Sequence, residues 1–231
     1  MRRISVLIVL FTIFNICFGQ KNEILQENYP LIINHYDLKL LFDFSNEILD
    51  GTCNVTIENK SDSSIDKIPF LLYRLMTVNS IQNQQGKELN FSQKNVSFPD
   101  FEKLQVNSIK IDENILPHST IALKIQYSGH LLGYQETGMQ YVKDKISENF
   151  TLIRNDAYSY PILAKPSIDF LRKNILSNNF TYRLSVTVPD TLMVANGGLL
   201  LSKTTENGNV TYKYESKEPS WRIDIAVVLA P

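Results

Sequence analysis

Residues 188–198 read V-P-D-T-L-M-V-A-N-G-G, and residues 211–228 read T-Y-K-Y-E-S-K-E-P-S-W-R-I-D-I-A-V-V. These runs predict strands over residues 182–188, 193–195, 210–214 and 222–228. The Asn-Gly-Gly at 196–198 is a turn between strands and not a cofactor loop. Short strands separated by turn residues decide the fold class, because they are typical of antiparallel sandwiches and open sheets.

The same pattern extends upstream, where apolar and polar residues alternate with the period of a half-buried strand. It predicts strands over residues 36–44, 53–57, 68–75, 78–81, 89–91, 109–111 and 121–127. Turns are expected at Asp50-Gly51, at Gln85-Gly86-Lys87 and at Leu116-Pro117-His118. Only residues 167–176 read as a short helix, with Ser167 as its N-cap. We therefore predict an all-β protein, an antiparallel β-sandwich or saddle-like open sheet with one short helix.

The composition is that of a globular protein and does not favour nucleic acid or an anionic membrane surface as a partner. Hydrophobic residues make up 43% and charged residues 20% of the 231 positions, which is ordinary for a globular protein with a sizeable core. A net charge of −1 gives no electrostatic reason to expect nucleic acid or an anionic membrane surface as a partner. Cys53 is expected to be a buried core thiol, because no histidine or cluster of basic residues lies near it in sequence to activate it.

The N-terminus has the pattern of a secretory signal over residues 1–19. Arg2 and Arg3 give the basic start, Ile4 to Ile16 form the apolar run, and Gly19 is a small residue suited to cleavage. The run is shorter than the roughly 20 residues of a transmembrane helix. An uncleaved anchor and a lipoprotein cysteine at Cys17 are the alternatives. The expected organisation is a signal peptide at 1–19, an arm at 20–30 and one β domain at 31–231, in a secreted or periplasmic protein.

The order of these landmarks resembles the N-terminal β domain of the aminopeptidase N-type zinc metallopeptidases. In that family a Val-Pro strand, a small-residue turn and a Tyr-x-Tyr strand precede the catalytic domain. The family's Tyr-x-Gly strand corresponds to Tyr127-Ser128-Gly129, and its Pro-x-x-x-x-Pro loop end corresponds to Pro161 to Pro166. The resemblance implies a β domain that packs on a catalytic domain outside this sequence and borders the substrate cleft.

Residues 128–167 are the least strand-like part of the chain, and such a long segment is typical of a functional loop. The resemblance places a residue that grips the substrate's amino group nine positions before the first of those prolines, where this chain has Leu152. The family's arginine is replaced by Ala157. The hypothesis is that Glu136, Arg154 and Asp156 bind substrate in a different geometry. The alternative is a structural loop in which Arg154 and Asp156 make local hydrogen bonds. The Asp144/Glu148 carboxylates have ordinary surface spacing.

The same loop is rich in large semi-polar side chains of the kind enriched at interfaces. We therefore predict that it forms an exposed docking surface together with the C-terminal edge, and that the isolated chain self-associates or depends on a chaperone. The predicted interface residues are Tyr134, Met139, Tyr141, Tyr158 and Tyr160.

Catalytic chemistry is not expected in this chain. A zincin needs two histidines four apart on one helix face with a glutamate between them, and His35, His118 and His130 have no such spacing. No catalytic residue, metal ligand or cofactor is therefore assigned here, and the resemblance implies zinc only in the catalytic domain.

Two functions remain open from the sequence. The first is the non-catalytic N-terminal domain of an exported aminopeptidase-like metallopeptidase. It partners a catalytic domain in cis or in trans and contacts a peptide substrate. The second is a stand-alone secreted β-sandwich that binds a peptide, a glycan or a partner protein.

Overall fold

The computed structural model describes residues 29–134, 137–138, 144–175, 178–216, 218–219 and 225–231. The described chain forms three β-sheets and one short helical segment, so the predicted all-β class is confirmed. The predicted signal peptide, and the arm before Tyr29, lie outside the described residues.

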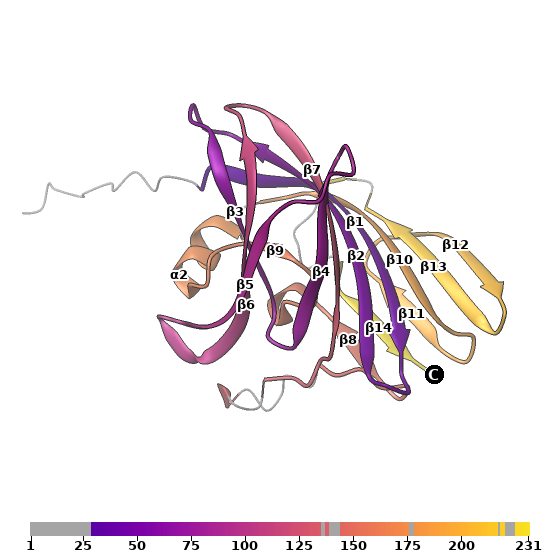
Figure 1. Ribbon diagram of the computed structural model, residues 1–231. Coiled ribbons are helices and arrows are strands. Elements are labelled where there is room, and N and C mark those ends of the chain that lie inside the picture. Colours follow the sequence, from indigo (N-terminus) through magenta and orange to yellow (C-terminus); the bar gives the residue numbers. More distant parts are fainter. Residues whose placement is uncertain (1–28, 135–136, 139–143, 176–177, 217, 220–224) are drawn as a thin grey trace, which may run out of the picture.

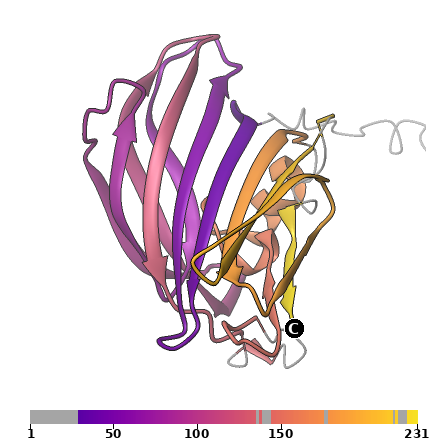
Figure 2. The same ribbon diagram turned by 90° about the vertical axis from the view of Figure 1, so that its right-hand side faces the viewer.

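The largest unit is a seven-stranded sheet in the order β12-β13-β10-β1-β2-β7-β4. Its long, twisted strands lie side by side in Figure 2. Its strands are β1 (Leu31–Asp43), β2 (Ile48–Asn59), β4 (Met76–Asn83), β7 (Thr120–Gly129), β10 (Thr181–Pro189), β12 (Leu199–Glu206) and β13 (Asn209–Glu215).

Two smaller sheets complete the sandwich. The four-stranded sheet β5-β6-β3-β9 contains β3 (Ile65–Tyr73), β5 (Phe91–Phe98), β6 (Phe101–Ile115) and β9 (Ile162–Leu163). The three-stranded sheet β11-β14-β8 contains β8 (Thr151–Ile153), β11 (Met193–Asn196) and β14 (Val227–Ala230). Figure 1 shows the four-stranded sheet and α2 toward one side of the molecule, and β12–β13 toward the other.

One pairing departs from the antiparallel prediction. β1 and β10 are parallel, in register from His35 opposite Thr181 to Leu41 opposite Thr187. Alternation of apolar residues reports burial of one face and carries no information on strand direction, so the sequence did not reveal this pairing.

The predicted hairpin turn at Asp50-Gly51 is wrong, because both residues lie within β2 and pair with Leu41 and Leu40 of β1. The turn lies earlier, at residues 44–47, where Glu47 has a φ of 55°. Gly51 is required for a different reason: a Cβ atom there would overlap the phenol ring of Tyr127. Its role is to accept a large side chain from β7, with which β2 is paired.

The predicted short helix is confirmed. It consists of α2 (Ile168–Phe170) and a wider π-turn η3 (Leu171–Ile175), and the Ser167 hydroxyl accepts a hydrogen bond from the N–H of Phe170 at 3.3 Å. The sequence missed β8, β9 and β12, and it predicted only the first residue of β5. The first two are very short, and β12 carries three consecutive leucines in place of an alternating pattern.

Residues 157–164 form an extended loop segment that is buried along its whole length, after the short turn η2 (Asn155–Ala157). Loops usually lie at the surface because a buried backbone must find hydrogen-bond partners. In this segment, tyrosine hydroxyls donate hydrogen bonds to three of the backbone carbonyls. Tyr134 donates to the carbonyl of Ala157 at 3.1 Å, Tyr127 to that of Ser159 at 3.4 Å, and Tyr36 to that of Pro161 at 3.0 Å.

The four-stranded sheet also binds the segment. The N–H of Tyr73 donates to the carbonyl of Tyr158 at 2.8 Å, and residues 162–163 pair with β3 as β9. Tyr158 itself has a left-handed backbone, with a φ of 54°, at the bend into the segment. Hydrogen bonds from the tyrosine hydroxyls and from β3 therefore hold the buried segment in place between the sheets.

We expect Tyr36→Phe and Tyr134→Phe each to lower the free energy of unfolding by about 1–3 kcal/mol, because each leaves a buried carbonyl without its donor. Tyr127→Phe should cost less, since a 3.4 Å contact is a weak hydrogen bond. Urea unfolding of the three variants measures the order. Equal losses, or a larger loss for Tyr127→Phe, would contradict the assignment of these hydroxyls as the supports of the segment.

Candidate functional site

The predicted docking tyrosines are not at the surface. Tyr134, Tyr158 and Tyr160 are all buried, so the prediction that they form an exposed surface is corrected. Tyr134 and Tyr73 pack edge to face at 5.2 Å between ring centroids, and Tyr160 packs in the same way on Tyr36 at 5.7 Å. The tyrosines are buried because the loop that carries them passes through the core. Met139 and Tyr141 lie outside the described residues.

The proposed substrate-binding residues are brought together only in part. Glu136 lies outside the described residues. Arg154 and Asp156 are close, with 3.8 Å between a guanidinium nitrogen and a carboxylate oxygen. The shorter contact of Arg154 is with Asp144, whose Oδ2 accepts a hydrogen bond from Nε at 3.0 Å.

Asp144 is buried, which corrects its assignment as an ordinary surface carboxylate. Burial raises the pKa of Asp144, and the hydrogen bond from Arg154 opposes that rise. Arg154 therefore balances a buried charge, and Asp156 is the one of these three side chains that is mainly exposed to solvent. The three residues form a structural ion-pair cluster with a single exposed carboxylate.

The surface beside this cluster is the outward face of the three-stranded sheet. Leu152 lies opposite Val228, Val228 lies opposite Ala195, and Met193 lies opposite Ala230. Their neighbours along the strands, Thr151, Ile153, Val194, Val227 and Leu229, point inward and are buried. Every side chain of the outward row is therefore apolar. We call the row Leu152, Met193, Ala195, Val228 and Ala230 the apolar face.

An antiparallel sheet that faces water on one side normally carries polar residues there. The apolar face lacks them, and Met193 is 62% exposed. Figures 1 and 2 show the last described residue beside β14 in this sheet. The sequence contained the signal: M-V-A at 193–195 and V-V-L-A at 227–230 are apolar at both alternate positions, which is typical of a strand covered on both faces.

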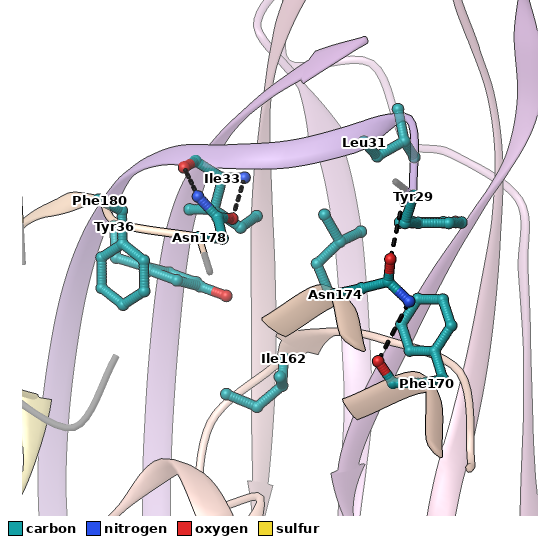
Figure 3. Close-up of a pocket in the computed structure, with 10 residues that line it drawn as sticks. Tyr29, Leu31, Ile33, Tyr36, Ile162, Phe170, Asn174, Asn178 and Phe180 are labelled. Atoms are coloured by element: carbon teal, nitrogen blue, oxygen red, sulfur yellow. Dashed lines mark hydrogen bonds between the residues drawn. The ribbon is translucent and has the colours of Figure 1, made fainter. Parts of the chain in front are cut away.

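A small hollow lies on the other side of the molecule, under the first residues of the described chain (Figure 3). Its apolar wall includes Ile162, Phe170 and Phe180, and its volume is about 20 Å³. Asn174 and Asn178 close it by accepting hydrogen bonds from the N–H groups of Tyr29 and Ile33 at 2.9 and 2.8 Å. A space of this size holds about one water molecule, so it is not a ligand site.

A larger open groove of about 1190 Å³ lies next to this hollow, over the outer side of β3 and β6. Its charged lining residues are Lys67, Lys110 and Lys165, with no carboxylate among the residues that line it. Lys67 is paired with Asp112, and Lys165 lies over the ring of Tyr29 at 5.2 Å from its centroid. The groove has the charge to receive an anion.

The described residues do not fit a zinc site. The three histidines bond to separate partners: His35 to Thr181, His118 to Asp62 and His130 to the carbonyl of Glu47. Within the described ranges no group of three or more His, Cys, Asp or Glu side chains is placed to hold a metal ion. The part of the chain that the structure describes contains no helix with the length and apolarity to cross a membrane.

Solved structures with a similar fold include M1 zinc metallopeptidases. The M1 zinc metallopeptidase from Deinococcus radiodurans matches with a TM-score of 0.64 and 19% identity, over 88% of this chain and 43% of that chain. A mutant of it bound to a Tyr-Ser-Ala substrate matches with a TM-score of 0.63 and 18% identity, over 87% and 43%. Native yeast LTA4 hydrolase matches with a TM-score of 0.58 and 14% identity, over 87% and 29%.

No family model and no curated protein matches the sequence. The chain spans less than half the length of these metallopeptidases, and at these identities the likeness is one of fold. The chain thus has the fold of a partial-length region of M1 zinc metallopeptidases, consistent with their N-terminal domain. The predicted resemblance is confirmed at that level.

We expect Arg154→Met to lower the free energy of unfolding by about 3 kcal/mol near neutral pH, because it leaves the buried Asp144 carboxylate unpaired. The pKa of Asp144 is raised in the folded state, so the folded state keeps the proton to higher pH than the unfolded state. Stability is therefore lost as the pH rises from the ordinary pKa through the raised one. This loss should be larger in the variant, whose pKa is higher still.

Urea unfolding of both proteins between about pH 4 and about pH 7 measures this effect. Asp156→Asn is the matched control and should cost less than about 1 kcal/mol, since Asp156 is an exposed partner. A variant whose loss is the same at both ends of the pH range would refute the role of Arg154 as the counter-charge of Asp144.

Proposed function

We propose that this chain is the non-catalytic N-terminal domain of an exported, aminopeptidase-like M1 metallopeptidase. In this proposal it packs on the catalytic domain and helps to shape the substrate cleft. The single observation that carries the proposal is the apolar face. Together with the fold, it supports a domain that is covered on this side by another domain.

The composition of the apolar face suits a domain interface. Interface cores are depleted of charge, and contiguous exposed apolar surface on a soluble protein commonly marks a contact site. The face combines one strand of the 128–167 loop with the C-terminal strand, which are the two regions that the sequence predicted to face a partner. We therefore assign docking to the three-stranded sheet and no longer to the loop tyrosines.

The apolar face also includes the position that the resemblance assigns to substrate recognition. Leu152 occupies the position that the resemblance assigns to recognition of the substrate's amino group, and its side chain is part of the apolar face. An isobutyl group cannot accept a hydrogen bond from an ammonium group. Asp156 remains as the exposed carboxylate nearby. We propose that the domain offers the cleft an apolar wall at Leu152, with Asp156 as the acidic group available to a peptide.

The docking proposal predicts that Met193→Lys weakens binding to the cognate catalytic domain, supplied in trans, by about tenfold or more, because the interface would then bury an unpaired ammonium group. Isothermal titration measures the affinity. Leu116→Lys is the matched control, since Leu116 is 58% exposed and belongs to the turn between β6 and β7, away from the apolar face.

Circular dichroism and urea unfolding show whether both variants keep the fold. If the catalytic domain binds the Met193 variant as tightly as the unchanged chain, the apolar face is not the docking surface. If no catalytic domain binds the unchanged chain, the proposed function fails.

Export is a separate part of the proposal and rests on the sequence of residues 1–19. We expect the exported protein to begin near Gln20 or Lys21 after cleavage beside Gly19. N-terminal sequencing of exported material checks this. Exported protein that still begins at Met1 contradicts cleavage, and exclusively intracellular protein contradicts export.

The open groove favours the second candidate function, a secreted binding module. Three lysines and no carboxylate line a groove that also offers the rings of Tyr29 and Phe170. A ligand for it would be extended and anionic. The two functions are distinguished by the coding sequence downstream: a frame with His-Glu-x-x-His supports the metallopeptidase domain, and an isolated gene supports the binding module.

A further inference from the structure

The seven-stranded sheet has one closed edge and one open edge. At the β4 edge, residues outside the sheet bind the outward backbone groups. The N–H of Val78 donates to the Gln93 side chain at 2.9 Å, and the carbonyl of Met76 accepts from Gln93 and Asn107 at 2.9 and 2.6 Å. Further along, the carbonyl of Ile81 accepts from the N–H of Leu89 at 2.8 Å. A further strand cannot pair with β4, because its backbone groups are already occupied.

The opposite edge is β12, and it is not covered in this way. β12 pairs with β13 on one side only. Among the described residues, the backbone of Leu199–Glu206 forms no hydrogen bond beyond this ladder. An open edge of this kind presents a row of N–H and C=O groups that another strand can bind.

The open strand also carries exposed apolar side chains on both of its faces. Leu199, Leu200 and Leu201 are 46%, 47% and 50% exposed, and Leu199 and Leu200 are consecutive residues of the ladder, so they point to opposite sides of the sheet. Soluble proteins usually protect an edge strand with charge or a bulge. β12 has both, a bulge between Leu200 and Ser202 and the charged Lys203, but they leave the leucines uncovered.

We propose that β12 is a self-association strand, through which two copies of this chain pair antiparallel and join their seven-stranded sheets. An exposed sheet edge is completed by an extended strand, and β12 of a second copy is an extended strand with matching chemistry. Lys203 and Glu206 leave the strand without net charge, so two copies of it do not repel each other.

The closed β4 edge determines how far the association goes. Pairing of β12 with β4 of the next copy would continue without limit, as head-to-tail contacts do when they fail to close. The bonds to Gln93, Asn107 and Leu89 block that contact. What remains is the two-fold contact of β12 with β12, which uses the same patch on both copies and ends at a dimer. This inference is independent of the proposed metallopeptidase function, because it uses neither the apolar face nor the cleft.

Sedimentation velocity of the full chain tests the proposal. We expect the weight-average mass to rise from one chain toward two between about 1 and about 100 µM, since a single strand pair is a small interface and forms a weak dimer. Hydrogen exchange should show protection of residues 199–206 that increases with concentration, while protection of the covered β4 strand stays constant.

Leu200→Lys should abolish this dimer, and Leu199→Lys is a second variant on the opposite face of the strand. Leu116→Lys is the control, and urea midpoints show whether the variants fold. A monomer at all concentrations overturns the proposal. So does a dimer that survives both β12 variants, or one that is lost in Met193→Lys but kept in Leu200→Lys, which would assign self-association to the apolar face. None of these outcomes depends on whether a catalytic domain binds.

Discussion

The structure depends on the need to satisfy the backbone of residues 157–164 inside the core. A buried peptide carbonyl without a donor is costly, and this segment has several in succession. The hydroxyls of Tyr36, Tyr127 and Tyr134 reach carbonyls two residues apart, and β3 binds the segment between them. These tyrosines come from β1, from β7 and from the start of the long loop, so the segment holds both major sheets in one arrangement. Tyr134, Tyr158 and Tyr160, which the loop composition marks as contact residues, are therefore structural.

The strands were predictable wherever one face is buried and the other is wet, as in β1, β2 and β7, because alternation then records the two environments directly. The helix start at Ser167 was predictable for an equally local reason, the hydroxyl that caps it. Strand direction, the membership of β9 in a sheet and the true place of the first hairpin turn were not. Each depends on partners far away in sequence. Gly51 illustrates the difficulty, since a glycine that makes room for the ring of Tyr127 has the same sequence signature as a glycine in a turn.

The candidate site likewise has features that the sequence makes predictable and features that it does not. Arg154 and Asp156 lie close to each other, but the burial of Asp144 makes the arginine its counter-charge, and burial of a charged residue is not visible in sequence. The apolar face was visible in principle, because residues 193–195 of β11 and all of β14 are apolar. The loop tyrosines were predicted as the interface instead, because aromatic residues in a long loop are the more familiar sign of one. A strand that is apolar on both sides is the better guide here, since a tyrosine can always turn inward when its hydroxyl finds a carbonyl.

The parallel pairing of β1 with β10 has a consequence for how the chain acquires its fold. The hydroxyl of Thr181 contacts the ring of His35 across 146 positions of sequence, so the centre of the large sheet closes only after β10 has been added to the growing chain. Until then, the hairpin of β1 and β2 has a free inner edge along its longest apolar strand. Non-local closure of this kind is slow, and a growing chain carries the exposed edge until β10 has been made. During biosynthesis, the strand that ends up at the centre of the seven-stranded sheet therefore behaves as an edge strand.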